Sequence, residues 1–328
     1  MTSISNKQTV QHLKIDADDV EVRLDRWLQQ AIPGATYSML VKWIRTGQIR
    51  IDGQRAKPGQ KLLAGQIVRL PPMYQHFLSA PKNNVVRNRD SSISKVLSEI
   101  KKNILYRDES LIAINKPSGL AVQGGSKTKI HLDMILNDLT FDYKIKPKLV
   151  HRLDKDTSGV LLLARTSTAA RHMTKMFREQ EIKKVYWALV SGTPKESEGT
   201  IEMPIKKLAG REGEKMTAIS GGQIAITNYS VIENIGQKVS WLRLRPLTGR
   251  THQLRVHCKL LGTPIVGDVR YGRDQSTIEG LPRKLHLHAR SVIFPHPTTG
   301  HILELVAPLI GHCVNSWEKL GLNVNQKP

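Results

Sequence analysis

The amino-acid sequence predicts an α/β (α+β) protein with two domains of unequal size. Its 328 residues can bury a large core and leave room for a small second domain. Residues 21–72 show two short amphipathic helices followed by a hairpin, whereas residues 103–328 alternate apolar strand-like runs with helical segments. Residues 73–102, between these domains, are rich in proline and polar residues and have no strong period, which is typical of a linker. A helix around residues 93–100 of this linker is left open.

The composition indicates a polyanionic partner. Lys and Arg number 50 against 28 Asp and Glu, which gives a formal net charge of +22. An excess of this size favours nucleic acid or an anionic membrane. No apolar run approaches the ~20 residues of a membrane-spanning helix, and the polar N-terminus has no apolar signal core. Nucleic acid is therefore the expected partner, and no membrane association is expected.

Cysteine and histidine usage argues against a metal site. The two cysteines, Cys258 and Cys313, are far apart in sequence and outside any CxxC pair. This pattern fits reduced thiols in the cytoplasm and excludes a cysteine-rich zinc ribbon. His286 and His288 have i, i+2 spacing on a predicted strand, but the sequence supplies no third ligand. We therefore predict a cytoplasmic protein without a bound metal.

The first domain follows a polar N-terminus, residues 1–20, that we predict to be flexible. Large apolar residues between positions 24 and 28 have helical spacing. Thr36 is suited to cap a second helix that Gly47 would end. The dipeptide Asp52-Gly53 then predicts a tight hairpin between two short strands.

The same domain is strongly basic. Residues 23–70 hold nine basic residues and two acidic ones. Such a density suits phosphate contacts, which position RNA without reading its sequence. An ordinary solvated basic face is the alternative interpretation. The residues predicted to contact RNA are Arg26, Lys42, Arg45, Arg50 and Lys57.

The second domain is predicted to hold most of the strands. Short apolar or alternating runs mark these strands, at residues 104–106, 111–115, 147–150, 160–164, 184–190 and 239–245. Helical spacing predicts helices at residues 169–181 and 251–261. The glycine-containing residues 191–223 are predicted to form loops and short hairpins.

The string HRLDKDTSG at residues 151–159 lies between two apolar runs and predicts a turn. It places Asp154 and Asp156 among basic residues. A surface that attracts phosphates gains nothing from an acid at its centre, so these carboxylates require an explanation. A solvated, salt-bridged turn is one explanation, and a reactive carboxylate is the other.

This string resembles the active-site motif of the RluA-type pseudouridine synthases, H-R-L-D-x-x-T-S-G, without a gap. Four more segments resemble signatures of that family in the family's order, at residues 115–119, 184–186, 249–257 and 267–272. Residues 23–25, 47–53 and 57–58 make the first domain similar to an S4 RNA-binding domain. Residues 121–126 and 158–162 look most similar to the RluC type, which implies large-subunit ribosomal RNA as the substrate.

The resemblance implies a mixed, mostly antiparallel central sheet flanked by helices, with the active cleft across it. It implies that Asp154 is the catalytic carboxylate and that Arg255 pairs with it. Tyr186 is a core aromatic on periodicity alone, but the family pattern makes it the residue that packs on the target base and handles a proton. Arg152 would fill the space that the base leaves. Lys116 is assigned to RNA binding, with a sharp turn as the alternative role of its segment.

The implied reaction breaks the N1–C1′ bond of uridine, rotates the uracil and rejoins it through C5. Substrate and product contain the same atoms at the same oxidation level, so no cofactor is required, and the sequence has no P-loop and no GxGxxG after a strand. An ionised carboxylate must act as nucleophile or base, and the base must leave the helical stack. Attack on the sugar and attack on the base both remain open.

Three functions are compared. We predict a monomeric synthase that isomerises specific uridines in large-subunit (23S) ribosomal RNA or its assembly precursor. A synthase for other RNA sites is the first alternative, including the small-subunit type, whose motif has Gly in place of His151. A non-catalytic RNA-binding or ribosome-assembly factor is the second. The joint presence of Asp154, Tyr186 and Arg255 argues against it, because a retired active site tends to lose one of them.

Overall fold

The computed structural model describes residues 10–16, 19–77, 91–124, 130–143, 145–208 and 215–328. The chain divides into two units, Met1–Ser92 and Ile93–Pro328. The predicted flexible character of residues 1–9 and 17–18, and the predicted linker at residues 78–90, lie outside the described residues. No helix in the described ranges has the length and apolarity needed to cross a membrane.

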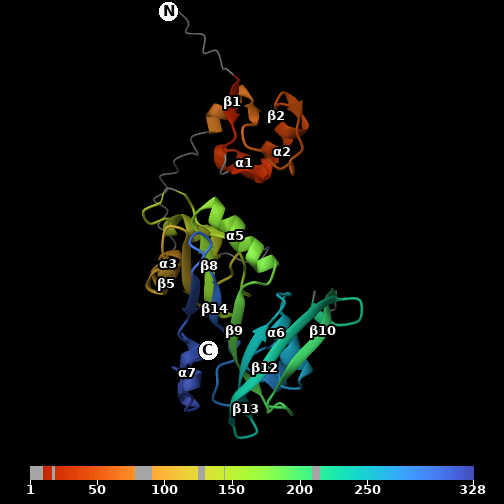
Figure 1. The fold of residues 1–328 in the computed structure, drawn as a ribbon, viewed down its shortest axis with the longest axis vertical. Coiled ribbons are helices and arrows are strands. Elements are labelled where there is room, and N and C mark those ends of the chain that lie inside the picture. Colours follow the sequence, from red (N-terminus) through yellow and green to blue (C-terminus); the bar gives the residue numbers. More distant parts are fainter. Residues whose placement is uncertain (1–9, 17–18, 78–90, 125–129, 144, 209–214) are drawn as a thin grey trace, which may run out of the picture. The chain divides into compact units, whose positions relative to one another are not determined.

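The first unit packs two helices on a small antiparallel sheet (Figure 1). The helices are α1 (Leu24–Ala31) and α2 (Tyr37–Arg45), and the short 3-10 helix η2 (Pro72–Phe77) follows the sheet. Four described strands run in the order β1-β4-β2-β3, namely β1 (Gln11–Lys14), β4 (Ile67–Leu70), β2 (Arg50–Ile51) and β3 (Gln54–Arg55). Trp27, Leu28, Leu40 and Trp43 contribute to its buried core.

Local sequence signals form this unit as expected. The side chain of Thr36 accepts a hydrogen bond from the backbone N–H of Met39 at 3.4 Å, which caps α2. Asp52 and Gly53 both have positive φ, 50° and 78°, as the tight hairpin requires.

The prediction of a flexible N-terminus is wrong for the residues of β1. Gln11–Lys14 pairs antiparallel with β4, and Ile15 after it is buried in the core. Pairing is favoured because β4 would otherwise expose an open edge, while Leu13 and Ile15 add apolar contacts.

The second unit is built on one large sheet. The described strands run in the order β11-β10-β12-β13-β9-β14-β8-β6-β5, with β15 beside β14 and β7 beside β8. All of these pairs are antiparallel except the parallel pair of β14 with β8. The prediction of a mixed, mostly antiparallel sheet is therefore confirmed. The strands are β5 (Ile104–Arg107), β6 (Leu111–Lys116), β7 (Lys148–Leu149), β8 (Ser158–Ala164), β9 (Lys183–Ser191), β10 (Glu198–Leu208), β11 (Lys215–Ala218), β12 (Gln223–Ile235), β13 (Val239–Pro246), β14 (Leu287–Pro295) and β15 (Ile302–Val306).

Helices cover both faces of this sheet. They are α3 (Ser91–Lys102), α4 (Leu132–Ile135), α5 (Ser167–Arg178), α6 (Gln253–Leu260) and α7 (His312–Lys319), with 3-10 turns at η3 (Leu136–Leu139) and η4 (Arg273–Ser276). On β8, Leu161 and Leu163 pack with α3 and α4, whereas Val160 and Leu162 pack with α5. Burial on both faces explains why β8 is a continuous apolar run rather than an alternating one.

Two segments differ in part from the prediction. Helix α3 occupies the end of the predicted linker, where the sequence leaves a helix around residues 93–100 open, because Leu97 and Ile100 are buried in the core of the second unit. Residues 191–223, predicted as loops and short hairpins, form the long strand β10, which pairs antiparallel with the shorter β11 and with β12. Many side chains of β10 are exposed, so its sequence lacks the apolar alternation that marks a half-buried strand.

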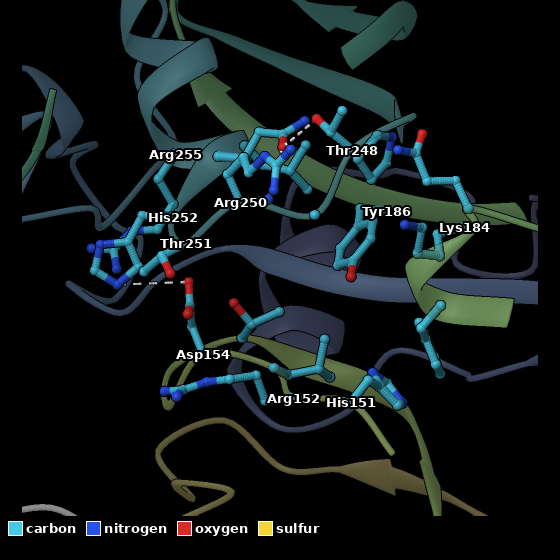
Figure 2. A pocket seen from close by; sticks show the side chains of 18 of the residues that line it. His151, Arg152, Asp154, Lys184, Tyr186, Thr248, Arg250, Thr251, His252 and Arg255 are labelled. Carbon is cyan, nitrogen blue, oxygen red and sulfur yellow. Dashed lines mark hydrogen bonds and ion pairs between the residues drawn. The ribbon is translucent and has the colours of Figure 1, made fainter. Parts of the chain in front are cut away.

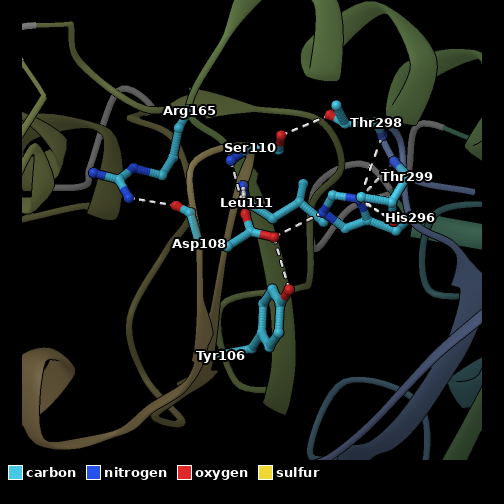
Figure 3. Close-up of polar contacts among 8 residues, drawn as sticks. All are labelled: Tyr106, Asp108, Ser110, Leu111, Arg165, His296, Thr298 and Thr299. Carbon is cyan, nitrogen blue, oxygen red and sulfur yellow. Dashed lines mark hydrogen bonds and ion pairs between the residues drawn. The ribbon is translucent and has the colours of Figure 1, made fainter. Parts of the chain in front are cut away.

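A partly buried polar cluster connects the turn between β5 and β6 with the turn after β14 (Figure 3). One carboxylate oxygen of Asp108 accepts hydrogen bonds from the backbone N–H groups of Ser110 and Leu111, both at 2.7 Å. The other oxygen accepts from the Tyr106 hydroxyl at 2.7 Å and lies 2.8 Å from Nε2 of His296, just past β14. Burial would raise the pKa of Asp108, but these hydrogen bonds outweigh burial and lower it.

Candidate active site

Asp154 lies where two hollows of the second unit meet. One hollow of about 410 Å³ is lined by the segment before β8, by β9 and by the connection from β13 into α6. The other, of about 770 Å³, extends along the segments after Pro117 and around Arg283. Arg152, Asp154, His252 and Arg255 line both hollows. Figure 2 shows two side chains directed into the first hollow, that of Asp154 from the turn before β8 and that of Tyr186 from β9.

Strand β14 lies between β8 and β9 and sets the distance between them. Its residue Ala289 pairs with Gly159 of β8 on one side and with Tyr186 of β9 on the other. Gly159 has φ 108°, and a Cβ there would lie 2.2 Å from the Ala289 carbonyl oxygen. Only glycine allows this approach, so the end of the 151–159 string is fixed against β14.

Lys116, which is fully buried, stabilises the turn that contains Asp154. Its ammonium donates to the backbone carbonyls of Pro117, Leu120 and Lys155 at 3.0, 2.9 and 3.0 Å. An ammonium has three donors, and all three are used here. Burial lowers the pKa of Lys116 to about 7, although Asp156 and Asp154 raise it.

The predicted contact between Lys116 and RNA is therefore wrong for this structure, because the side chain has no exposed surface. The turn role of its segment is the one observed. Gly119 N–H donates to the Lys155 carbonyl at 2.9 Å, and the Ser118 hydroxyl donates to the Asp156 carbonyl at 2.8 Å. Residues 116–119 thus form hydrogen bonds with the backbone that follows Asp154 and fix its position.

His151 has a structural role in the same string. Its Nε2 accepts the backbone N–H of Leu162 at 2.8 Å, and its ring stacks on Phe177 with centroids 4.3 Å apart. Burial lowers its pKa to about 3, with a smaller contribution from Lys184, so the ring is neutral.

Arg255 does not form the predicted ion pair with Asp154. Its Nε and Nη2 donate to the two carboxylate oxygens of Asp268 at 2.8 and 2.7 Å. Asp268 is buried, and it also accepts the Tyr271 backbone N–H at 3.1 Å. Burial alone would lower the pKa of Arg255, but Asp268 raises it, so the guanidinium stays charged beside the site. The sequence could not tell which acid faces it.

The basic group nearest to Asp154 is His252, whose Nε2 lies 3.8 Å from Oδ2 of Asp154. His252 precedes α6 and has left-handed backbone angles, φ 54° and ψ 18°. Its Nδ1 lies 2.7 Å from the hydroxyl of Tyr271. His252 lies in the 249–257 segment, but nothing in the sequence distinguishes it from the neighbouring residues as a site residue.

Tyr186 and Arg152 line the first hollow together with Asp154. Tyr186 is partly buried, and its pKa is raised by burial and then by the charge of Asp154, so its phenol is protonated at neutral pH. Arg152 is exposed at the edge of both hollows. In the part of the chain that the structure describes, its guanidinium has no ion-pair or hydrogen-bond partner.

The basic residues of the first unit differ in availability. Arg26, Lys42, Arg45 and Lys57 are exposed. Arg50 is half-buried and donates to the carbonyls of Gly47 and Gly53, both at 3.1 Å, so it holds the hairpin turn.

The described residues contain no group of three or more acid, histidine or cysteine side chains placed to hold a metal. His286 lies 2.8 Å from the Ser316 hydroxyl, and His288 lies 2.9 Å from the Ser158 hydroxyl. Both histidines are buried and bonded to protein groups.

Comparisons with known proteins identify the class of protein to which this fold and site belong. The family model for RNA pseudouridylate synthase matches residues 110–260, which include Asp154, Tyr186 and Arg255, and the S4 domain model matches residues 22–68. The chain resembles human RNA Pseudouridylate Synthase Domain Containing 4, with 30% identity, a TM-score of 0.59 and coverage of 71% of this chain and 98% of that chain.

Two bacterial relatives match nearly the whole chain. Ribosomal large subunit pseudouridine synthase C of Pasteurella multocida is 37% identical over 307 residues, covering 92% of this chain and 91% of the relative. The protein of the same name from Escherichia coli is 35% identical over 311 residues, covering 92% and 93%. The chain therefore belongs to the RNA pseudouridine synthase family and carries an N-terminal S4 domain. It is an isomerase whose partner is RNA, which confirms the predicted family, enzyme class and kind of partner.

Sequence reasoning missed three polar residues of the site. Asp268 binds Arg255, and His252 approaches Asp154. Gln253 is buried, and its side chain bonds Thr248 and the backbone N–H of Arg250, which shapes the connection into α6. All three lie in segments that resemble family signatures, so the signal was present, but only the fold shows which group each one contacts.

Proposed function

We propose that this protein converts specific uridines of large-subunit (23S) ribosomal RNA, or of its assembly precursor, into pseudouridine. The names of the relatives from Pasteurella and Escherichia support this substrate. The observation that carries the proposal is the placement of Asp154, a partly exposed carboxylate at the junction of two hollows in a turn that Lys116 fixes. We also propose that the protein acts as a monomer in the cytoplasm, where such RNA is assembled into ribosomes.

The first step is extrusion of the target uridine from its stack. Unstacking costs a few kcal/mol, roughly, and is repaid by contacts in the pocket. Arg152 is suited to fill the vacated space, because it is exposed, charged and adjacent to Asp154. Its guanidinium can stack on neighbouring bases and contact phosphates.

Asp154 then acts as nucleophile or base. Attack on the sugar and attack on the uracil ring both use this carboxylate, and both end in the same exchange of bonds. The N1–C1′ bond breaks and a C5–C1′ bond forms, while C5 loses its proton and N1 gains one. Arg255, fixed by Asp268, supplies a nearby positive charge without bonding to the carboxylate.

Tyr186 is the proposed group for proton movement. Because its phenol is protonated at neutral pH, it can accept a proton only as it gives one away. It is therefore suited to pass the C5 proton to solvent through a water molecule. Its place on β9 also allows the ring to pack against the uracil.

The S4 domain is proposed to hold RNA through phosphate contacts. Arg26, Lys42, Arg45 and Lys57 are exposed and suited to this role. Arg50 is a weaker candidate, because its guanidinium already bonds two carbonyls of the hairpin.

The test is an assay with purified protein and transcribed 23S ribosomal RNA, in which pseudouridines are mapped by carbodiimide-dependent stops of reverse transcription. Asp154→Asn should form no product and should bind RNA within about twofold of wild type, since it removes a charge and a nucleophile but no volume. Asp156→Asn, in the same turn, is the matched control and should remain active.

A native rate in Asp154→Asn would remove Asp154 from its role. If the wild-type protein binds the RNA but forms no pseudouridine, the non-catalytic factor becomes the better explanation. Loss of the same modified sites in cells that lack the protein would identify the uridines.

A further inference from the structure

His252 has a backbone conformation that its side chain type rarely adopts. Left-handed angles in a residue other than glycine carry a strain of about 1–3 kcal/mol and persist where the surroundings impose them. Here the imposing contact is with Tyr271, whose hydroxyl lies 2.7 Å from Nδ1 and whose ring meets the imidazole edge-on at 5.6 Å. The strained backbone thus delivers the other edge of the ring, Nε2, to Asp154.

The hydrogen bonds around Tyr271 define the tautomer of His252. The backbone N–H of Met216 donates to the Tyr271 oxygen at 3.3 Å. With one acceptor position of the oxygen occupied, the phenolic proton is free to donate to Nδ1 of His252, which accepts in this arrangement. In a neutral imidazole the ring proton consequently sits on Nε2, facing the Asp154 carboxylate.

Burial, the largest influence on the pKa of His252, keeps the ring neutral at pH 7. Burial lowers its pKa; Asp154 raises it, Arg255 and Arg270 lower it, and Asp268 raises it, with a net lowering. Burial raises the pKa of the Tyr271 hydroxyl, which faces the ring. At neutral pH the phenol therefore keeps its proton while Nδ1 of the neutral imidazole carries none, as this arrangement requires.

Two buried cations near Asp154, Lys116 and Arg255, are directed elsewhere. Lys116 spends all three donors on backbone carbonyls, and Arg255 presents its Nε and Nη2 to Asp268. At 3.8 Å, the distance from Nε2 to Oδ2 is longer than a hydrogen bond, and a shift of about 1 Å would close it.

We infer that His252 is a positioning residue for Asp154, with Tyr271 fixing its tautomer so that Nε2–H donates to one carboxylate oxygen and leaves the other to react. The inference rests on the proposed catalytic role of Asp154. It predicts that Tyr271 affects the rate of isomerisation only through His252, and that His252 affects this rate through its Nε2–H group facing Asp154.

Glutamine and asparagine separate the two edges of the ring. His252→Gln places an amide N–H near the position of Nε2, whereas His252→Asn reaches only the position of Nδ1 and tolerates the left-handed backbone. In single-turnover assays on transcribed 23S ribosomal RNA, His252→Asn should slow isomerisation on the order of 100-fold, as expected for a misplaced reacting group. His252→Gln should restore most of that rate, and RNA affinity should stay within about twofold in both.

Tyr271→Phe tests the dependence on the tautomer. It should slow the wild-type enzyme several-fold and should add nothing in the His252→Asn background, since its effect passes through the Nε2 edge. His301→Asn, at an exposed histidine outside the pocket, is the matched control and should match wild type.

A wild-type rate in His252→Asn overturns the inference, as does equal slowing by Asn and Gln, a parallel loss of RNA affinity, or full additivity of Tyr271→Phe. An inactive wild-type protein contradicts the proposed function instead, so the two failures are distinguishable.

Discussion

Arg255 and Asp268 show how much one buried ion pair can contribute. Their side chains are 10% and 0% exposed, and both oxygens of Asp268 are bonded to the guanidinium. A bidentate pair of this kind fixes the direction of the arginine as well as its charge. Substituting one or both residues of the pair therefore separates the structural role of Arg255 from its proposed catalytic role.

Arg255→Met should lower the free energy of unfolding by about 3–5 kcal/mol, because it leaves Asp268 buried and unpaired. The double variant Arg255→Met/Asp268→Leu should regain most of that stability, since neither charge is then buried. Urea unfolding measures both values. Isomerisation should be lost in the single and the double variant, and a fully active double variant would reduce Arg255 to a structural role.

Lys116 illustrates a limit of sequence reasoning at the residue scale. A lysine in a basic, RNA-binding chain is most simply assigned to a phosphate. The fold instead surrounds it with three carbonyls, which no local pattern announces. Arg255 was likewise placed near Asp154 from the motif, but its partner comes from a segment 13 residues further along the chain.

At the scale of elements, β14 positions the two sides of the site relative to each other, because its residue Ala289 pairs with Gly159 of β8 and with Tyr186 of β9. The close approach of the Gly159 and Ala289 backbones requires glycine at position 159, and the free energy of unfolding of a variant measures this requirement. A second glycine with positive φ, Gly300, has φ 75° and no atom within 4 Å of a built Cβ. The pair therefore separates backbone strain from steric conflict.

Gly159→Ala should lower the free energy of unfolding by about 3 kcal/mol or more, since it combines left-handed strain with a clash against the Ala289 backbone. Gly300→Ala should lower it by only about 1–2 kcal/mol, from strain alone. Thermal or urea unfolding of both variants provides the comparison. Equal losses would mean that β14 moves aside easily.

Elements with local signals could be predicted well. The cap at Thr36, the Asp52-Gly53 hairpin and the apolar run of β8 each act through nearest neighbours or through complete burial. Strand β10 could not be predicted in this way, because its exposed residues owe their conformation to pairing with β12. Likewise, β1 is a strand only because the edge of β4 is there to receive it.

At the scale of the whole molecule, buried neutral histidines predict how stability changes with pH. Burial lowers the pKa of His151 to about 3 and that of His257, His286 and His288 to about 4, against an ordinary value of 6.5. Below pH 6.5 the unfolded chain binds protons that the folded chain does not. Stability is therefore full above pH 6.5 and falls as the pH drops toward 4.

Each such histidine should contribute up to about 1.4 kcal/mol per pH unit in that window. The free energy of unfolding, measured with urea at pH 7.5, 6.5 and 5.5, should fall between the last two values and change little between the first two. His286→Gln should make the fall shallower, whereas His301→Gln, at an exposed position, should leave it unchanged. A flat profile for the wild type would show that these histidines are not buried as described.

The charge of the whole chain predicts a strong dependence of RNA binding on salt. Replacing Arg26, Lys42, Arg45 and Lys57 together by Ala should reduce the slope of log Kd against log salt concentration by roughly 3, at about 0.7–0.9 per phosphate contact. Filter-binding titrations at several salt concentrations measure the slope, with Lys238→Ala as the control. An unchanged slope would mean that the S4 face does not contact phosphates.

The arrangement of β8, β14 and β9 has one further consequence. Two steps between neighbouring strands, each about 4.8 Å, separate Gly159 from Tyr186, and β8 and β14 are buried through most of their length. The distance between these two residues is therefore fixed, because packed interiors deform little. The RNA must then change its conformation to fit the site. A uridine in an unpaired loop should reach the reacting groups at a lower cost in free energy than one in a perfect duplex.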